Sequence, residues 1–112
     1  MRKLVLTGAV LLAASPAVAD TWTGVYDGTI VSTYGDGRVV KVYVNADHSY
    51  SIALPDGREL RGTWADADGQ SCFTLSSGGK PTCFPIKEYK VGDTFVGEDP
   101  TGKFTGVIQA GR

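Results

Sequence analysis

The chain has 112 residues, and its 11 basic and 12 acidic side chains give a formal net charge of −1. A chain of this length holds one domain with a modest core. The near-neutral charge argues against nucleic acid as a partner, because nucleic-acid binding needs a strongly basic face.

The first 19 residues have the three-part layout of a secretion signal. Basic residues 2 and 3 precede an apolar run from Leu4 to Ala14, and the small-x-small triplet Ala17-Val18-Ala19 follows. The apolar run has about 11 residues, roughly half the length that crosses a bilayer as a helix. We therefore predict a signal peptide over residues 1–19 and a periplasmic or secreted mature chain without a membrane span. That chain, residues 20–112, keeps nine basic and twelve acidic side chains, a net charge of −3.

Turn-forming clusters recur through the rest of the chain at intervals of roughly ten residues. Glycine supplies positive φ, and Asp and Asn bond back to their own turns, so such clusters reverse the chain direction. The clusters are residues 35–37, 45–47, 55–57, 66–69, 77–79, 92–93 and 99–102. Seven turns imply eight short strands, so residues 20–112 are predicted to form a single all-β domain, an antiparallel meander.

The segments between these turns alternate in the way that half-buried strands do, with every second side chain on one face. In the first segment Trp22, Gly24, Tyr26, Gly28 and Ile30 share the predicted inward face, opposed by Val25 among others. The inward residues expected in the later segments are Val40, Val42, Val44, Tyr50, Ile52, Leu54, Leu60, Gly62, Trp64, Phe73, Leu75, Phe84, Ile86, Phe95, Gly97, Phe104, Gly106 and Ile108.

An inward glycine lies two residues from an inward aromatic in several of these segments, as in Trp22-Thr-Gly24, Gly62-Thr-Trp64, Phe95-Val-Gly97 and Phe104-Thr-Gly106. Such a pair lets a sheet bend while the ring covers the bare backbone. The pattern favours a small barrel, with a strongly curled open sheet as the alternative. Because the pattern joins the first segment to the last two, we expect the N- and C-terminal strands to pair.

Cys72 and Cys83 lie at equal distances from the turn centred on Ser77 and Gly78, which places them opposite each other across a hairpin. In an exported protein such a pair forms a disulfide. Two cysteines and one distant histidine do not supply the ligands of a zinc site. We predict a Cys72–Cys83 bridge on the face opposite Phe73 and Phe84, outside the core.

No other constellation of residues indicates catalysis, a metal or a cofactor. Asp66-Ala67-Asp68-Gly69 resembles the start of a calcium loop but lacks the bidentate Glu, since Ser77 occupies that position, so we expect a hairpin turn. His48 is expected to be solvated in a turn, with the turn residues Asp47 and Asp56 as its nearby acids. None of the serines stands in a Gly-x-Ser-x-Gly turn.

Four aromatic residues, Trp22, Tyr26, Tyr50 and Trp64, fall on the predicted inward face. Eight strands enclose an interior that is either filled by side chains or holds one small ligand. We expect a filled interior, with a ligand cavity as the alternative.

Several segments between residues 39 and 86 together resemble a known pattern. These are Val44-Asn45-Ala46-Asp47, Ser49-Tyr50, Gly62-Thr63-Trp64, Asp66 to Gly69, Cys72-Phe73-Thr74 and Pro81-Thr82-Cys83-Phe84. The pattern is similar to that of small exported proteins of alphaproteobacteria for which no activity is established, and His48 stands where it commonly has glycine. The resemblance therefore implies no catalytic residue and no cofactor. In size, export and single disulfide the chain is also similar to periplasmic eight-stranded inhibitor barrels, an analogy that fixes no function.

The sequence thus favours a non-enzymatic binding or protein-interaction module, which would have an envelope protein as its partner. The alternatives are an inhibitor of a protease or lysozyme and a carrier of a small ligand in the barrel lumen.

Overall fold

The computed structural model describes residues 21–112, which contain eight strands, no helix and one disulfide. The strands are β1 (Gly28–Tyr34), β2 (Val39–Val44), β3 (Ser49–Ala53), β4 (Glu59–Ala67), β5 (Gln70–Leu75), β6 (Thr82–Pro85), β7 (Thr94–Asp99) and β8 (Gly102–Ala110). All strand pairs are antiparallel, so the predicted all-β architecture is confirmed. The predicted signal peptide and its cleavage site lie outside the described residues.

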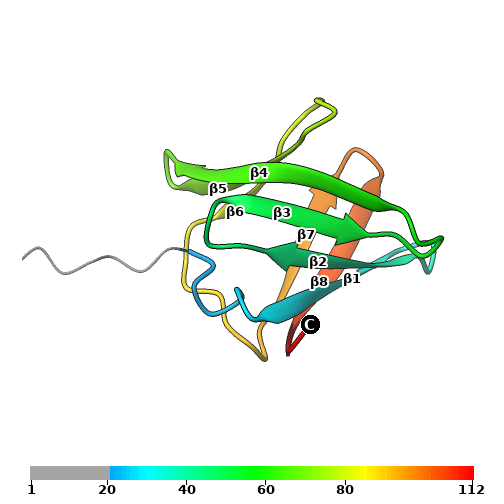
Figure 1. Ribbon diagram of the computed structural model, residues 1–112, viewed down its shortest axis with the longest axis horizontal. Helices are drawn as coiled ribbons and strands as arrows, with labels where there is room; N and C mark the ends of the chain where they lie inside the picture. The colour runs from blue at the N-terminus through cyan, green and yellow to red at the C-terminus, as the bar shows by residue number, and fades with distance from the viewer. Residues whose placement is uncertain (1–20) are drawn as a thin grey trace, which may run out of the picture.

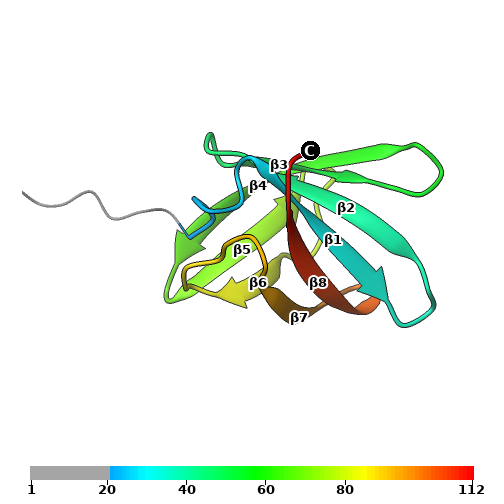
Figure 2. The same cartoon turned by 90° about the horizontal axis from the view of Figure 1, so that it is seen from below.

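The eight strands form one sheet that curls into a nearly closed barrel, in the order β6-β5-β4-β3-β2-β1-β8-β7 (Figures 1 and 2). β1 pairs with β8 along its whole length, from Gly28 opposite Ala110 to Tyr34 opposite Phe104, which confirms the predicted pairing of the terminal strands. The sheet is interrupted between β6 and β7, which do not pair through their backbones. The rings of Phe84 and Phe95 meet across this seam, with centroids 5.4 Å apart.

The predicted alternation holds in β2 to β5 and in β8. Within the strands, the buried hydrophobic side chains of the inward set are Ile30, Val40, Val44, Tyr50, Trp64, Phe73, Phe84, Phe104 and Ile108. Ile86 is an exception, because β6 ends at Pro85 and the alternation does not reach beyond it. Its side chain is 44% exposed.

The prediction of a strand from Trp22 to Gly28 is wrong, because β1 begins only at Gly28. Two successive turns precede it, in which the Val25 amide donates to the Trp22 carbonyl and the Gly28 amide to the Val25 carbonyl, both at 2.8 Å. Turns of this kind repeat every three residues instead of every two. Trp22 and Val25, assigned to opposite faces by the alternation, are therefore both fully buried.

The pairing of inward glycines with aromatic rings is present, but the ring comes from the neighbouring strand. Gly97 lies opposite Phe104 and Gly106 opposite Phe95 in the register of β7 and β8. A Cβ added at Gly106 would lie 2.7 Å from the Phe95 ring, and one added at Gly97 would lie 2.5 Å from the Phe104 ring. The rings thus occupy the space that a side chain would need, as expected for covered glycines in a curved sheet.

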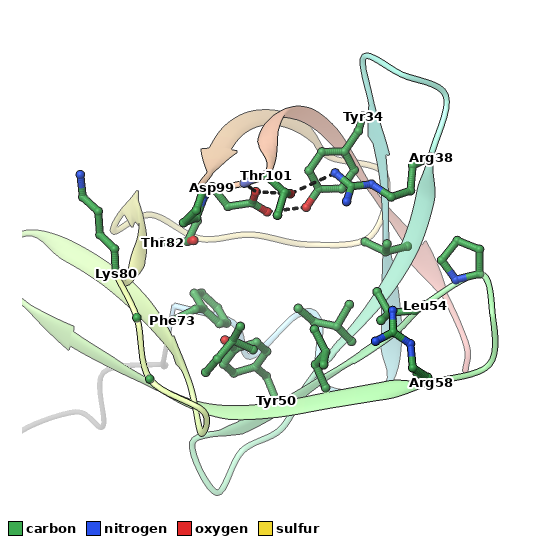
Figure 3. A pocket seen from close by; sticks show the side chains of 18 of the residues that line it. Tyr34, Arg38, Tyr50, Leu54, Arg58, Phe73, Lys80, Thr82, Asp99 and Thr101 are labelled. Atoms are coloured by element: carbon green, nitrogen blue, oxygen red, sulfur yellow. Dashed lines mark hydrogen bonds between the residues drawn. The ribbon is translucent and has the colours of Figure 1, made fainter.

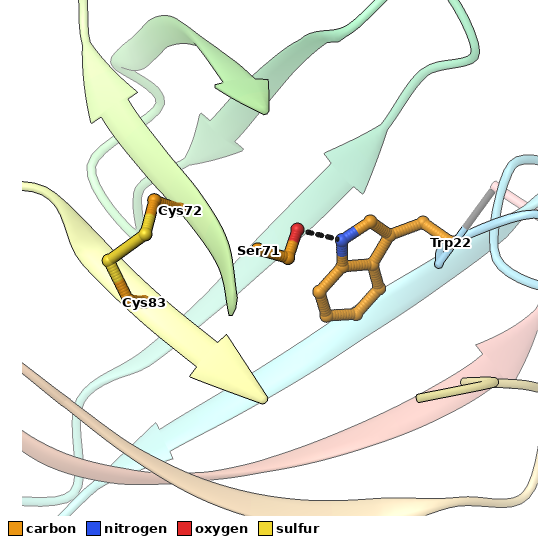
Figure 4. Close-up of a disulfide and its surroundings, with 4 residues drawn as sticks. All are labelled: Trp22, Ser71, Cys72 and Cys83. Carbon is orange, nitrogen blue, oxygen red and sulfur yellow. Dashed lines mark hydrogen bonds between the residues drawn. A yellow bond between two sulfur atoms is a disulfide. The ribbon is translucent and has the colours of Figure 1, made fainter. Parts of the chain in front are cut away.

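Cys72 and Cys83 are directly opposite in the register of β5 and β6 and form the predicted disulfide (Figure 4). Cys83 is exposed and Cys72 half-buried, so the bridge lies outside the core. Ser71, the residue before Cys72 on β5, points inward and is fully buried.

Within residues 21–112 no helix is long and apolar enough to cross a membrane.

Candidate functional site

The two ends of the barrel differ, and one of them is plugged by the turns before β1. Trp22 stacks on Tyr89, with ring centroids 4.3 Å apart and planes 8° from parallel. Its indole Nε1 donates to the Ser71 hydroxyl at 2.8 Å (Figure 4). Tyr89 in turn donates from its hydroxyl to the Pro85 carbonyl at 2.8 Å. These contacts close this end, which we call the plugged end.

Aromatic rings fill the interior next to the plug. The Phe73 ring lies between the two tryptophans, with its centroid 5.3 Å from that of Trp22 and 6.4 Å from that of Trp64. Tyr50 meets Phe73 edge to face at 5.0 Å. Of the four aromatics expected inside, Trp22, Tyr50 and Trp64 are buried and Tyr26 is half-buried against the core. The Phe73 ring occupies the space between Trp22 and Trp64, and the cavity that reaches Trp22 measures only about 70 Å³. The expectation of a filled interior therefore describes this half of the barrel.

The other half opens to solvent as a pocket of about 590 Å³ (Figure 3). Alternate turns of a meander lie at the same end, so the hairpins β1–β2, β3–β4, β5–β6 and β7–β8 all surround this mouth. The apolar side chains of the wall come from strands β2 to β5 and the turn after β3. They are Val40, Tyr50, Ile52, Leu54, Leu60, Phe73 and Leu75. The volume lies within the range of small-molecule sites, about 300–1,000 Å³.

A hydrogen-bonded cluster of Tyr34, Asp99 and Thr101 forms one side of the mouth. The Tyr34 hydroxyl donates to the Asp99 carboxylate at 2.5 Å, and the amide and hydroxyl of Thr101 donate to its other oxygen at 2.7 and 2.6 Å. Burial, together with the hydrogen bond to Asp99, raises the pKa of Tyr34 well above its usual value. Burial also opposes ionisation of Asp99, but hydrogen bonds from Thr101 and Tyr34 outweigh it and hold the pKa of Asp99 below its usual value. At neutral pH the cluster therefore contains a neutral tyrosine and an ionised carboxylate.

Three cationic side chains surround the same mouth. The Arg38 guanidinium stacks on the Tyr34 ring, 4.0 Å from its centroid, and donates from Nη2 to the Thr101 hydroxyl at 3.0 Å. Arg58 forms an ion pair with Asp56 at 2.7 Å, and Lys80 comes from the β5–β6 connection. Figure 3 shows Arg38 beside Tyr34, facing Tyr50 and Phe73 across the pocket, with Lys80 on a separate side.

The His48 turn lies away from this pocket, at the plugged end of the barrel. His48 is exposed as predicted, but its ring stacks on Trp64 with centroids 4.0 Å apart. Its φ of 71° is in the left-handed region, which explains why glycine suits this position. The adjacent Asp47 carboxylate accepts from the Ser49 amide at 2.9 Å, whereas Asp56 lies at the opposite end among the pocket residues.

The Asp66–Gly69 segment is a hairpin turn, as predicted. Asp68 and Gly69 both have positive φ, 54° and 78°, and they form the two-residue connection between β4 and β5. The Asp66 carboxylate accepts from the Thr21 hydroxyl at 2.6 Å. Within residues 21–112 no group of three or more His, Cys, Asp or Glu side chains lies close enough together to hold a metal ion.

Sequence reasoning did not single out the polar residues of the mouth, Arg38, Arg58, Lys80, Tyr34 and Asp99. A usable signal is present in the turn order. In an eight-stranded meander the first, third, fifth and seventh turns meet at one end, and these residues lie in or beside those four turns. If the charged residues of alternate turns are treated as one group, the sequence predicts that these residues lie around one end of the barrel.

Comparison of the chain with protein-family models, curated proteins and solved structures gives no match. What the pocket can do therefore follows from its own chemistry. It combines an apolar wall with a polar rim, and its lining includes neither histidine nor cysteine. This combination of surfaces suits the binding of a small molecule that is partly apolar.

Proposed function

We propose that this protein is a non-enzymatic binding protein that holds a small, partly apolar ligand in the open end of its barrel. The observation that carries the proposal is the pocket of about 590 Å³, which opens between four hairpin turns above a filled aromatic layer. The aromatic layer forms the floor of the pocket, and a ligand would enter through the mouth.

Two features of the pocket support binding over catalysis. Ile52, Leu54 and Leu60 are half-buried and line the wall, so a ligand that covers them removes apolar surface from water. The carboxylate on the rim, Asp99, already accepts three hydrogen bonds from Tyr34 and Thr101. Its lowered pKa makes it a poor general base, because a catalytic base works best with a pKa near the operating pH.

The proposed site of action is the periplasm or the exterior. The Cys72–Cys83 bridge is compatible with an oxidising compartment, and the leader predicted for residues 1–19 would direct the chain there. The alternatives of an envelope-protein partner and of a protease or lysozyme inhibitor receive less support. Binding to another protein, in either of these roles, would be served by a protruding loop. The connections around the mouth instead have only two to six residues.

The test uses N-phenyl-1-naphthylamine, a neutral apolar dye whose fluorescence rises when it leaves water. The purified protein should bind one dye molecule with a Kd on the order of 10 µM, as expected for a ligand of this size. A tryptophan at the mouth should obstruct the pocket, so Leu54→Trp should weaken binding by about tenfold, a loss of about 1.4 kcal/mol.

Two further variants make this test decisive. Leu60→Trp should obstruct the same pocket from β4. It takes the place of Leu54→Trp if the circular dichroism spectrum shows that Leu54→Trp is not folded. Val96→Trp is the matched control, because Val96 is 78% exposed on β7 and does not line the pocket. The absence of saturable binding, or equal affinities for the wall variants and the control, would refute the proposal.

A further inference from the structure

The charged groups around the mouth differ in how many partners they have within the protein, and this difference points to the charge of the ligand. The mouth carries three cations, Arg38, Arg58 and Lys80, and two carboxylates, Asp56 and Asp99. Both carboxylates accept hydrogen bonds from the protein. Asp56 accepts from the Arg58 amide at 3.0 Å and from its Nε at 2.7 Å, and Asp99 accepts from Tyr34 and Thr101.

Arg38 differs from these carboxylates, because within residues 21–112 it forms no ion pair, although its charge helps to lower the pKa of Asp99. The ion pairs within residues 21–112 are Arg58–Asp56 and Arg61–Glu59. Arg38 is held instead by the face of Tyr34 and by the Thr101 hydroxyl. Among the described residues its Nε is buried without a hydrogen-bond partner. A buried donor without a partner is costly, so the side chain gains free energy if it turns to bring this edge of the guanidinium to a ligand oxygen.

Arginine also has the geometry to bind an anionic group. Its planar guanidinium presents several donors in a fixed fork that matches carboxylate and similar anions. The aromatic face of Tyr34 and the Thr101 hydroxyl fix the plane of this fork at the rim. Lys80 is exposed at the same mouth and adds a second cation without an ion pair among the described residues.

We infer that the ligand is a small anionic amphiphile, with one carboxylate-like or sulfonate-like group at Arg38 and an apolar body directed toward Tyr50 and Phe73. This inference rests on the proposed function and adds to it the chemical class and the orientation of the ligand. The positive mouth is a local feature, because the chain as a whole has a net charge of −1.

The experiment compares two dyes that share one anilinonaphthalene skeleton. One is the neutral N-phenyl-1-naphthylamine and the other is 8-anilinonaphthalene-1-sulfonate, which adds a single anionic group. The purified protein at pH 7 should bind the sulfonate at least about tenfold more tightly than the neutral dye, as expected for one charge-assisted contact. Arg38→Met should remove that advantage, so that the two dyes bind the variant with affinities within about twofold of each other.

Arg61→Met is the matched control, because Arg61 is exposed on β4 and does not line the pocket, and it should alter neither affinity. Lys80→Met provides a second test at an exposed position, and it should reduce the preference for the sulfonate over the neutral dye by about threefold. Equal affinities of the wild-type protein for the two dyes would overturn the inference and leave the proposed function standing. A preference for the sulfonate that stays unchanged in Arg38→Met would also overturn it. Failure of the neutral dye to bind at all would instead remove the proposed function.

Discussion

Among the described glycines, Gly62 leaves the least room for a side chain. It lies opposite Tyr50 on β3 and Leu75 on β5. A Cβ added to it would lie 2.2 Å from the Thr74 carbonyl oxygen, 2.7 Å from the Tyr50 ring and 2.9 Å from the Leu75 Cα. Two of these three neighbours are backbone atoms, so the barrel wall itself would have to move. Gly62 therefore allows the close approach of three strands beside the pocket.

Gly62→Ala should lower the free energy of unfolding by about 1–3 kcal/mol, the range expected when a methyl group is forced into a packed interior. Gly35→Ala is the matched control, because no atom of residues 21–112 lies within 4 Å of a Cβ added there, and it should change stability by less than about 0.5 kcal/mol. Urea unfolding of the two variants provides the measurement. Equal stabilities would show that the close approach at Gly62 does not constrain the sheet.

At the scale of elements, the β5–β6 hairpin combines the longest connection around the mouth with the shortest strand. β6 has four residues and pairs only with β5, since its other edge faces the unpaired seam with β7. The disulfide links the middle of this pair, at Cys72 and Cys83, while Phe84 on the inward face packs against Phe73 and Phe95. The bridge thus holds an edge strand that lines the pocket at Thr82.

Replacing Cys72 and Cys83 together by alanine should cost about 3 kcal/mol, the loop-closure entropy of a loop of about a dozen residues. For a domain of this size the melting temperature should fall by on the order of 10 °C, with an unchanged far-UV spectrum. Differential scanning calorimetry gives the first quantity, and Thr74→Ala, at an exposed position on β5, is the control. A melting temperature equal to that of the control would contradict the role assigned to the bridge.

The elements were largely predictable because their signals are local. Turn residues placed all seven chain reversals, and alternation placed most inward side chains in β2 to β5 and in β8. The segment before β1 was not predictable in this way, because Trp22 and Val25 follow the three-residue repeat of two turns. The burial of Trp22 depends on contacts with Tyr89 and Ser71, which are distant in the sequence.

At the scale of the whole molecule, the two halves of the barrel differ in the size of the side chains that point inward. Aromatic rings occupy the plugged half, where Trp22 contacts Phe73, Phe84 and Tyr89. Around the mouth, leucine and isoleucine side chains such as Ile52 line the wall without filling it. The same inward face is therefore a packed core at one end and a pocket at the other.

The pocket itself could not be predicted from the alternation of residues. Alternation shows that Ile52 and Leu60 point inward, but the distance across the barrel depends on strand number and stagger. The plug at Trp22, which decides that only one end is open, lies in the segment that the alternation misplaced. The cations of the mouth are separated by 20 and 22 positions, Arg38 from Arg58 and Arg58 from Lys80, and only the fold brings them to one rim.

The most direct test of the account is a methyl NMR titration of the protein with N-phenyl-1-naphthylamine. Binding at the open end should shift the methyl resonances of Ile52, Leu54 and Leu60, which line the pocket. The resonances of Val25 and Ile108, buried toward the plugged end, should remain in place. Shifts confined to Val25 and Ile108, or to the exposed Val96, would contradict binding in the open end of the barrel.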